Sequence, residues 1–166
     1  MGGRRGSDTL LSMCLDVAEQ AAGNAQVERA EKVLLQLPQV DCELRHRFAP
    51  GVYMREVVMP AGTFIIGHQH RTEHLNIITE GSARVMMDGV IEEIKAPCVF
   101  ISKPGVRKIL YIHETCRWAT IHPTNETKMD RLEEELIVKS PSFLEHCEQD
   151  LRILKDSLKE EAACLG

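Results

Sequence analysis

The chain lacks several features that would assign it to a broad functional class. In its 166 residues there is no apolar run of the length that spans a bilayer, about 20 residues. Its 20 lysines and arginines are scattered and are outnumbered by 25 aspartates and glutamates. No basic stripe is therefore available to contact nucleic acid phosphates, and we expect neither a membrane nor a nucleic acid as partner.

The cysteines and the first residues exclude further classes. The six cysteines lie far apart and form no Cys-x-x-Cys pair, which disfavours a thiolate zinc site or a redox dithiol. We expect them to be reduced and packed as small hydrophobes. The start, Met1 to Ser7, is not followed by the hydrophobic segment of a secretory signal, so we expect a cytoplasmic protein.

The chain length suits one domain with short extensions, and residues 1–39 are expected to form an N-terminal helical extension. Gly23-Asn24 is predicted to separate two amphipathic helices, and Pro38 to end the second. Their apolar stripes are Leu10, Leu11, Cys14, Val17, Ala18 and Ala21 in the first, and Val27, Ala30, Val33 and Leu34 in the second.

Residues 40–124 change to short β-rich runs separated by turn residues, which indicates a mainly β domain. Asp88-Gly89, between two apolar runs, predicts a two-residue hairpin. Strands this closely spaced are typical of a β-sandwich or small barrel. The nine predicted strands lie near 40–46, 52–59, 63–69, 74–79, 81–87, 90–95, 98–102, 107–112 and 116–122.

Residues 125–166 are predicted to form a C-terminal helical extension. Pro141 separates a charged helix, Asp130 to Val138, from a longer one whose apolar residues recur in steps of three and four. This seam suits packing on the chain's own helices or barrel as well as on a partner helix, and we expect a homodimer. The seam consists of Leu144, Cys147, Leu151, Leu154 and Leu158.

The most informative stretch places three of the seven histidines within seven residues: His68, His70 and His74. On an extended strand the first two would leave the same face, and a turn would bring the third beside them. Neutral imidazole is a common ligand of transition metals, and three histidines leave coordination positions open. The pattern therefore predicts a site for Fe, Mn, Ni or Zn, which nitrogen ligands alone do not distinguish.

The spacing Gly62-x5-His68-x-His70-x3-His74-x6-Gly81 resembles the first metal motif of the cupin superfamily, with a histidine where glutamate is usual. Pro97 to Lys108 resembles the second motif, with lysine in place of the histidine ligand. The resemblance implies a double-stranded β-helix, the cupin jelly-roll barrel, over residues 40–124 with the metal site in its mouth.

The whole chain also resembles small cupin proteins of bacteria and their phages, through the strand end Trp118-Ala-Thr120-Ile-His122-Pro-Thr. Trp118 and His122 share one strand face, so if the first lines the cavity the second does as well. His122 is therefore a candidate fourth ligand, along with Glu73 and water. Since neutral imidazoles do not offset the charge of a divalent ion, a small anionic ligand is expected.

Two further residues are candidates for catalysis. Lys108, if it points into the barrel, would have a lowered proton affinity and would serve as a general base or an anion anchor; the alternative is a solvated lysine at the rim. Tyr111 would offer a hydroxyl to a substrate, or else pack on its strand. Arg55 and Glu56 lie on opposite strand faces, so at most one of them looks inward.

Two functional classes follow from these residues and the resemblance. The first is a metal-dependent enzyme, a dioxygenase or an isomerase or lyase, acting on a small molecule. The second is a non-catalytic barrel that binds a ligand, or a phage or cellular assembly protein that associates through its helical tails. Fold analogy does not decide between them.

Overall fold

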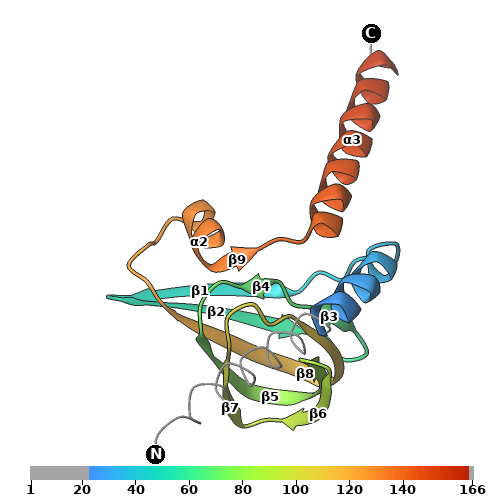
Figure 1. Cartoon of the computed structure of the whole chain (residues 1–166). Coiled ribbons are helices and arrows are strands. Elements are labelled where there is room, and N and C mark those ends of the chain that lie inside the picture. Colours follow the sequence, from blue (N-terminus) through green and yellow to red (C-terminus); the bar gives the residue numbers. More distant parts are fainter. Residues whose placement is uncertain (1–22, 165–166) are drawn as a thin grey trace, which may run out of the picture.

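The computed structural model describes residues 23–164, and antiparallel β-strands form the body of the molecule (Figure 1). The bounds of the strands are β1 Glu43–Ala49, β2 Val52–Met59, β3 Phe64–Ile66, β4 Gln69–His70, β5 His74–Met87, β6 Val90–Lys95, β7 Cys98–Ser102, β8 Lys108–Pro123 and β9 Ile137–Val138. The chain also contains helices α2 and α3, described below, and a helix over residues 23–34.

Two long strands, β5 and β8, organise the barrel. The sheet order is β1-β2-β8-β5-β6, with β3 added to β8 and β7 added to β5. The first half of β5 pairs with β7 and the end of β8, whereas its second half pairs with β6 and the start of β8. Each long strand therefore belongs to both halves of the barrel. This is the mainly β jelly-roll arrangement that the sequence predicts.

Gly81 allows β5 to bend without breaking. Its φ is +83°, a conformation that favours glycine, and a Cβ built there would lie 2.3 Å from the carbonyl oxygen of Thr115. The pairing of β5 with β8 shifts register on both sides of this residue. The four strands predicted at 74–79, 81–87, 107–112 and 116–122 are consequently two continuous ones, β5 and β8.

Of two further predictions, the structure confirms the hairpin at Asp88-Gly89 and divides the strand expected at 63–69. Asp88 and Gly89 both have positive φ and join the paired residues Met87 and Val90, which confirms the two-residue hairpin. The strand predicted at 63–69 is interrupted: β3 ends at Ile66 and pairs with β8, whereas β4 pairs with β9.

The core lies inside the barrel and is built from alternate residues of β2, β5, β6 and β8. Cys116 is a free thiol packed among apolar side chains, and burial raises its pKa to about 11. The buried members of the core are Met59, Ile78, Ala83, Val85, Ile94, Leu110, Ile112, Cys116 and Trp118.

The helix over residues 23–34 differs from the prediction in its start and in its buried face. Residues 23 and 24 are already helical, so no break occurs there; the first predicted helix lies outside the described residues. Gly23, Val27 and Glu31 are buried one helical turn apart, whereas Val33 is 64% exposed. The buried face thus includes a charged residue that an apolar stripe does not reveal.

The C-terminal segment contains α2 (Met129–Leu136) and α3 (Pro141–Cys164). The predicted helix at 130–138 ends two residues early because Ile137 and Val138 form β9 against β4. Leu132 and Leu136 of α2 pack on Tyr53 at the barrel, whereas α3 extends away from it (Figure 1). None of the described helices is long and apolar enough to cross a membrane.

Candidate metal centre

Three histidines from three strands meet at one end of the barrel. His70 ends β4, His74 begins β5 and His122 is the penultimate residue of β8. One ring nitrogen of each lies within 4.8 Å of the others, and the ring centroids are 4.2 to 5.1 Å apart. All three side chains are buried. The ends of three strands thus place three imidazoles around one point.

The nitrogen atoms of this group fit a metal ion. Nδ1 of His70, Nε2 of His74 and Nδ1 of His122 are buried and have no hydrogen-bond partner among the described residues. Nδ1 of His74 lies 3.0 Å from the carbonyl oxygen of Thr72 and donates to it, which leaves the lone pair on Nε2. Unpaired buried polar atoms are costly, and a shared cation would satisfy all three.

The surroundings keep these imidazoles neutral, as ligands must be. Burial lowers the pKa of His70 to about 2 and that of His122 to about 4, with added repulsion from the neighbouring histidines and from Lys108. The pKa of His74 is also lowered by burial, against the opposing effect of its bond to Thr72. At neutral pH the group therefore presents lone pairs without first releasing protons.

The structure does not bring His68 into this group, although the motif places it first. Residues 67 and 68 lie between β3 and β4, so the strand alternation that would align His68 with His70 does not extend across them. The His68 ring instead meets the edge of the Phe143 ring at 4.8 Å between centroids. Its buried Nδ1 has no hydrogen-bond partner among the described residues.

Of the other predicted ligands, His122 joins the group and Glu73 does not. Glu73 is exposed and lies with His74 and His122 along a shallow outer pocket. The face shared by Trp118, Thr120 and His122 does look inward, as strand alternation predicts.

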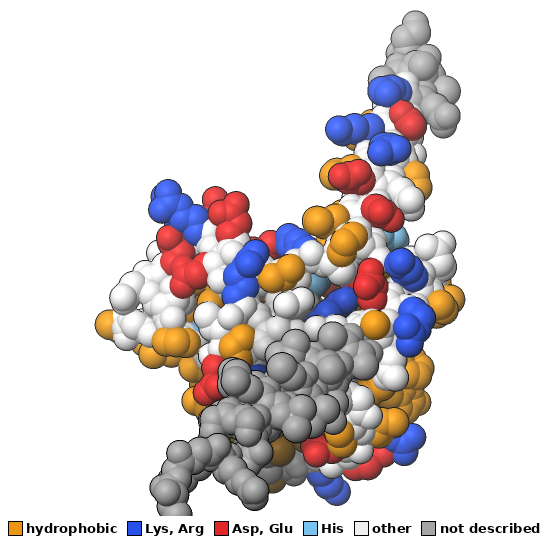
Figure 2. All heavy atoms as spheres, viewed as in Figure 1, with side chains coloured by type: hydrophobic (Ala, Val, Ile, Leu, Met, Phe, Trp, Pro, Cys, Tyr) orange, Lys and Arg blue, Asp and Glu red, His pale blue; other side chains and the backbone are white. Residues whose placement is uncertain are grey.

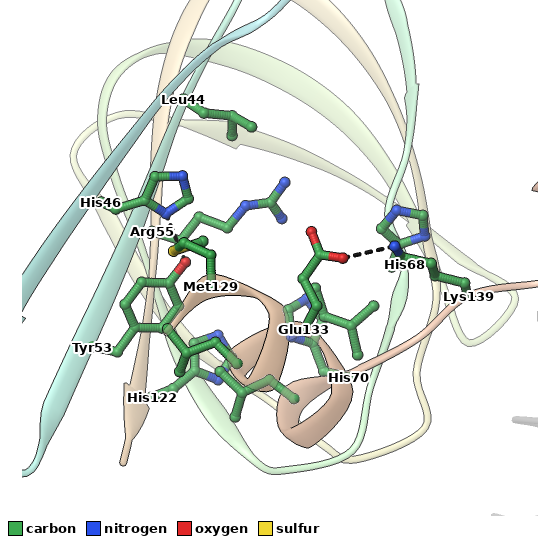
Figure 3. A pocket seen from close by; sticks show the side chains of 13 residues that line it. Leu44, His46, Tyr53, Arg55, His68, His70, His122, Met129, Glu133 and Lys139 are labelled. Carbon is green, nitrogen blue, oxygen red and sulfur yellow. Dashed lines mark hydrogen bonds and ion pairs between the residues drawn. The ribbon is translucent and has the colours of Figure 1, made fainter. Parts of the chain in front are cut away.

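Two cavities adjoin the histidine group. The first, of about 120 Å³, lies between the barrel mouth and α2 (Figure 3). There Glu133 and Lys139 form an ion pair at 2.7 Å, and His46 lies 2.8 Å from the hydroxyl of Tyr53. The spacing of Met129, Leu132, Glu133 and Leu136 on one helical face is the signal that would have placed Glu133 at the mouth.

The second cavity, of about 380 Å³, lies inside the barrel. Arg55 and Lys108 both line it. Of the neighbours Arg55 and Glu56, it is therefore Arg55 that looks inward, and Lys108 lies in the barrel rather than at a solvated rim. Glu56, on the other face of β2, is bound by Arg45, Arg47 and Arg117. His70 lines this cavity as well as the first, so the histidine group borders both spaces through that ring; His68, outside the group, also lines both.

Tyr111 lies on the opposite face of β8 from Lys108. Residues 108, 110 and 112 are buried, whereas the Tyr111 ring packs outside on Phe64, 4.9 Å between centroids, and against His113. Strand alternation forbids two residues three apart from sharing a face. Tyr111 lines none of the cavities described here.

The barrel is similar to solved cupin structures. An RmlC-like cupin family protein from Methanocaldococcus jannaschii with a double-stranded β-helix shares 13% identity over 50% of this chain and 80% of its own, with a TM-score of 0.44. The Cnp3 cupin domain of Schizosaccharomyces pombe shares 21% over 64% and 77%, with a TM-score of 0.42.

A third similar structure is a cupin-2 domain containing protein from Shewanella frigidimarina, at 15% identity over 54% of this chain and 86% of its own, with a TM-score of 0.42. No profile of a known protein family matches the chain. No curated protein matches it either.

Proposed function

We propose that this protein binds one divalent transition metal through His70, His74 and His122, and that the ion serves to bind a small molecule. The observation that supports the proposal is the set of three unpaired, buried ring nitrogens within 4.8 Å of one another. A three-nitrogen set with open positions is typical of catalytic or ligand-exchanging sites rather than closed structural ones.

The three imidazole ligands limit which metals the site can bind and which reactions it can support. Fe, Mn, Ni and Zn all accept imidazole, so the ligands do not select one of them by affinity. A bound ion would supply Lewis acidity or a redox centre, which suits a dioxygenase as well as an isomerase or lyase. Nζ of Lys108 lies in the lining of the larger cavity, where it could hold or release a proton. Burial lowers the pKa of Lys108 to about 8.

Metal content of purified variants tests the proposal. We expect one equivalent of metal per chain in the wild type, and loss of it in His70→Ala and His122→Ala, measured by elemental analysis after dialysis against a defined metal mixture. His68→Ala is the matched control, because His68 is close in sequence but outside the group. Full metal occupancy in both the His70 and the His122 variants would refute the proposal, provided that circular dichroism shows each to be folded.

A second proposal concerns α3. Leu144, Leu151, Leu154 and Leu158 are all about half exposed, and Figure 2 shows hydrophobic side chains along this helix between acidic and basic ones. In a heptad numbering, Leu144, Leu151 and Leu158 take the a positions and Leu154 takes a d position, so that they form one seam. Asp150 then takes a g position and Lys155 an e position beside this seam. A parallel pair of such helices sets Asp150 of one copy beside Lys155 of the other. We therefore propose that α3 associates with a second copy of the chain, as an assembly protein requires.

A further inference from the structure

The larger cavity is lined by cationic as well as apolar side chains. Arg55 and Lys108 carry the positive charges, and the neutral rings of His68 and His70 belong to the same lining. A molecule inside would therefore meet both hydrocarbon and positive charge. The apolar lining comprises Leu44, Val57, Met59, Ile65, Ile66, Leu110 and Trp118.

Lys108 lies in this cavity without a partner. Its side chain is only 7% exposed, and it forms no hydrogen bond or ion pair with any residue of the described range 23–164. The nearest acid acting on it, Asp88, is too distant for an ion pair and does not line the cavity. An ammonium group that is largely removed from water and has no counter-charge beside it is costly, and an anion in the cavity would offset that cost.

Arg55 is a second cation in the lining of this cavity, and it also lines the smaller one. Figure 3 shows its side chain reaching from β2 into the space between His46 and Glu133. It too makes no hydrogen bond or ion pair within residues 23–164, although it is near enough to His70 to lower the pKa of that ring. Asp41 is the acidic residue in the lining, and it is exposed at the rim. The interior therefore holds two cations and no buried counter-charge.

We propose that this cavity binds a small amphipathic carboxylic acid, with its carboxylate at Lys108 and its hydrocarbon body against Leu110 and Trp118. This assignment rests on the proposed function, since His70 lines the same cavity and would place the bound acid beside the ion. A carboxylate would give Lys108 a charge-assisted hydrogen bond, and it would balance the charge that neutral imidazoles leave on a divalent metal.

Calorimetric titration with phenylacetate tests the assignment, with 2-phenylethanol as the neutral analogue and acetate as the anion without a body. We expect phenylacetate to bind metal-loaded wild type at least about tenfold more tightly than either comparison compound, because 2-phenylethanol lacks the charge-assisted pair and acetate lacks the ring that would be buried. The preference over 2-phenylethanol is the one that reports on the charge. Lys108→Met should remove this preference, and Lys108→Arg should retain most of it. Lys103→Met is the control, since Lys103 is exposed on the loop before β8.

The outcomes separate this inference from the metal proposal. Preference for phenylacetate that is lost in Lys108→Met and kept in Lys103→Met supports the inference. The inference is overturned by equal affinity for phenylacetate and 2-phenylethanol, or by unchanged binding of phenylacetate in a folded Lys108→Met variant. The metal content of the same samples tests the histidine group separately. If the wild type holds no metal, titration of that protein with phenylacetate still tests the cationic pocket by itself.

Discussion

The guanidinium of Arg107 and the carboxylate of Glu31 form a two-point ion pair, with nitrogen to oxygen distances of 2.6 and 3.3 Å. Both side chains are buried, and Ser140 donates a hydrogen bond of 2.6 Å to the same carboxylate. Arg107 also donates to the carbonyl oxygen of Gly67. This network joins the N-terminal helix, the barrel beside Lys108, and the start of α3.

We predict that Glu31→Gln lowers the free energy of unfolding by about 3 kcal/mol, because it leaves the Arg107 charge buried and uncompensated. Chemical denaturation of the purified variant measures the change. Glu28→Gln on the same helix is the control and should stay within about 0.5 kcal/mol of wild type. A loss in Glu31→Gln no larger than in this control would contradict the role given to the pair.

Lys108 should destabilise the fold in a pH-dependent way. Its pKa is about 8 in the folded chain, against 10.5 for an ordinary lysine. The folded state therefore binds fewer protons between these values, so stability rises with pH across that window and the full penalty is present below pH 8. Without carboxylate ligands, Lys108→Met should be more stable than wild type by about 3 kcal/mol at pH 7.

That advantage should shrink as the pH rises from 8 towards 10.5, because wild type then loses the buried charge. Urea denaturation at pH 7 and pH 10 measures both differences. The exposed Lys103→Met variant should match wild type at either pH. Equal stability of Lys108→Met and wild type at pH 7 would show that the ammonium group is not desolvated as the structure places it.

Much of the barrel could be predicted because its signals are local. Strand alternation, the Asp88-Gly89 turn and the shared face of Trp118 and His122 all depend on residues close together in sequence. The histidine group was predicted only in part. His68 was placed in it by extending a strand across Gly67, and the chain ends β3 one residue earlier.

The Glu31–Arg107 pair could not be predicted from the sequence, since its members are 76 residues apart and each alone is typical of a solvated surface. The inward direction of Arg55 was undecided for a related reason. Strand alternation puts Arg55 and Glu56 on opposite faces of β2 but does not say which face is the outer one. The structure shows that Glu56 faces outward, because three arginines surround it: Arg45, Arg47 and Arg117.

Gly81 offers a direct test of how β5 turns the barrel. In Gly81→Ala the new Cβ would overlap backbone oxygens of Thr115 and Glu114, at 2.3 and 2.7 Å, in addition to the strain of φ +83°. We predict a loss of about 3 kcal/mol or more in the free energy of unfolding. Gly89→Ala separates the two effects, because its φ is +76° with no heavy atom within 4 Å. This control should lose about 1 kcal/mol, and a similar loss in both variants would contradict the close approach.

The α3 seam leads to the last prediction. If its leucines pack against a second copy, wild type should have twice the mass of one chain at micromolar concentration by light scattering. Leu151→Gln combined with Leu154→Gln should give the mass of one chain, since both substitutions put polar groups into the seam. Ile153→Gln is the matched control: Ile153 is 66% exposed on the same helix but lies off the seam, so the dimer should persist. A wild type that has the mass of one chain would refute self-association, and dissociation by Ile153→Gln would place the interface on another face of α3.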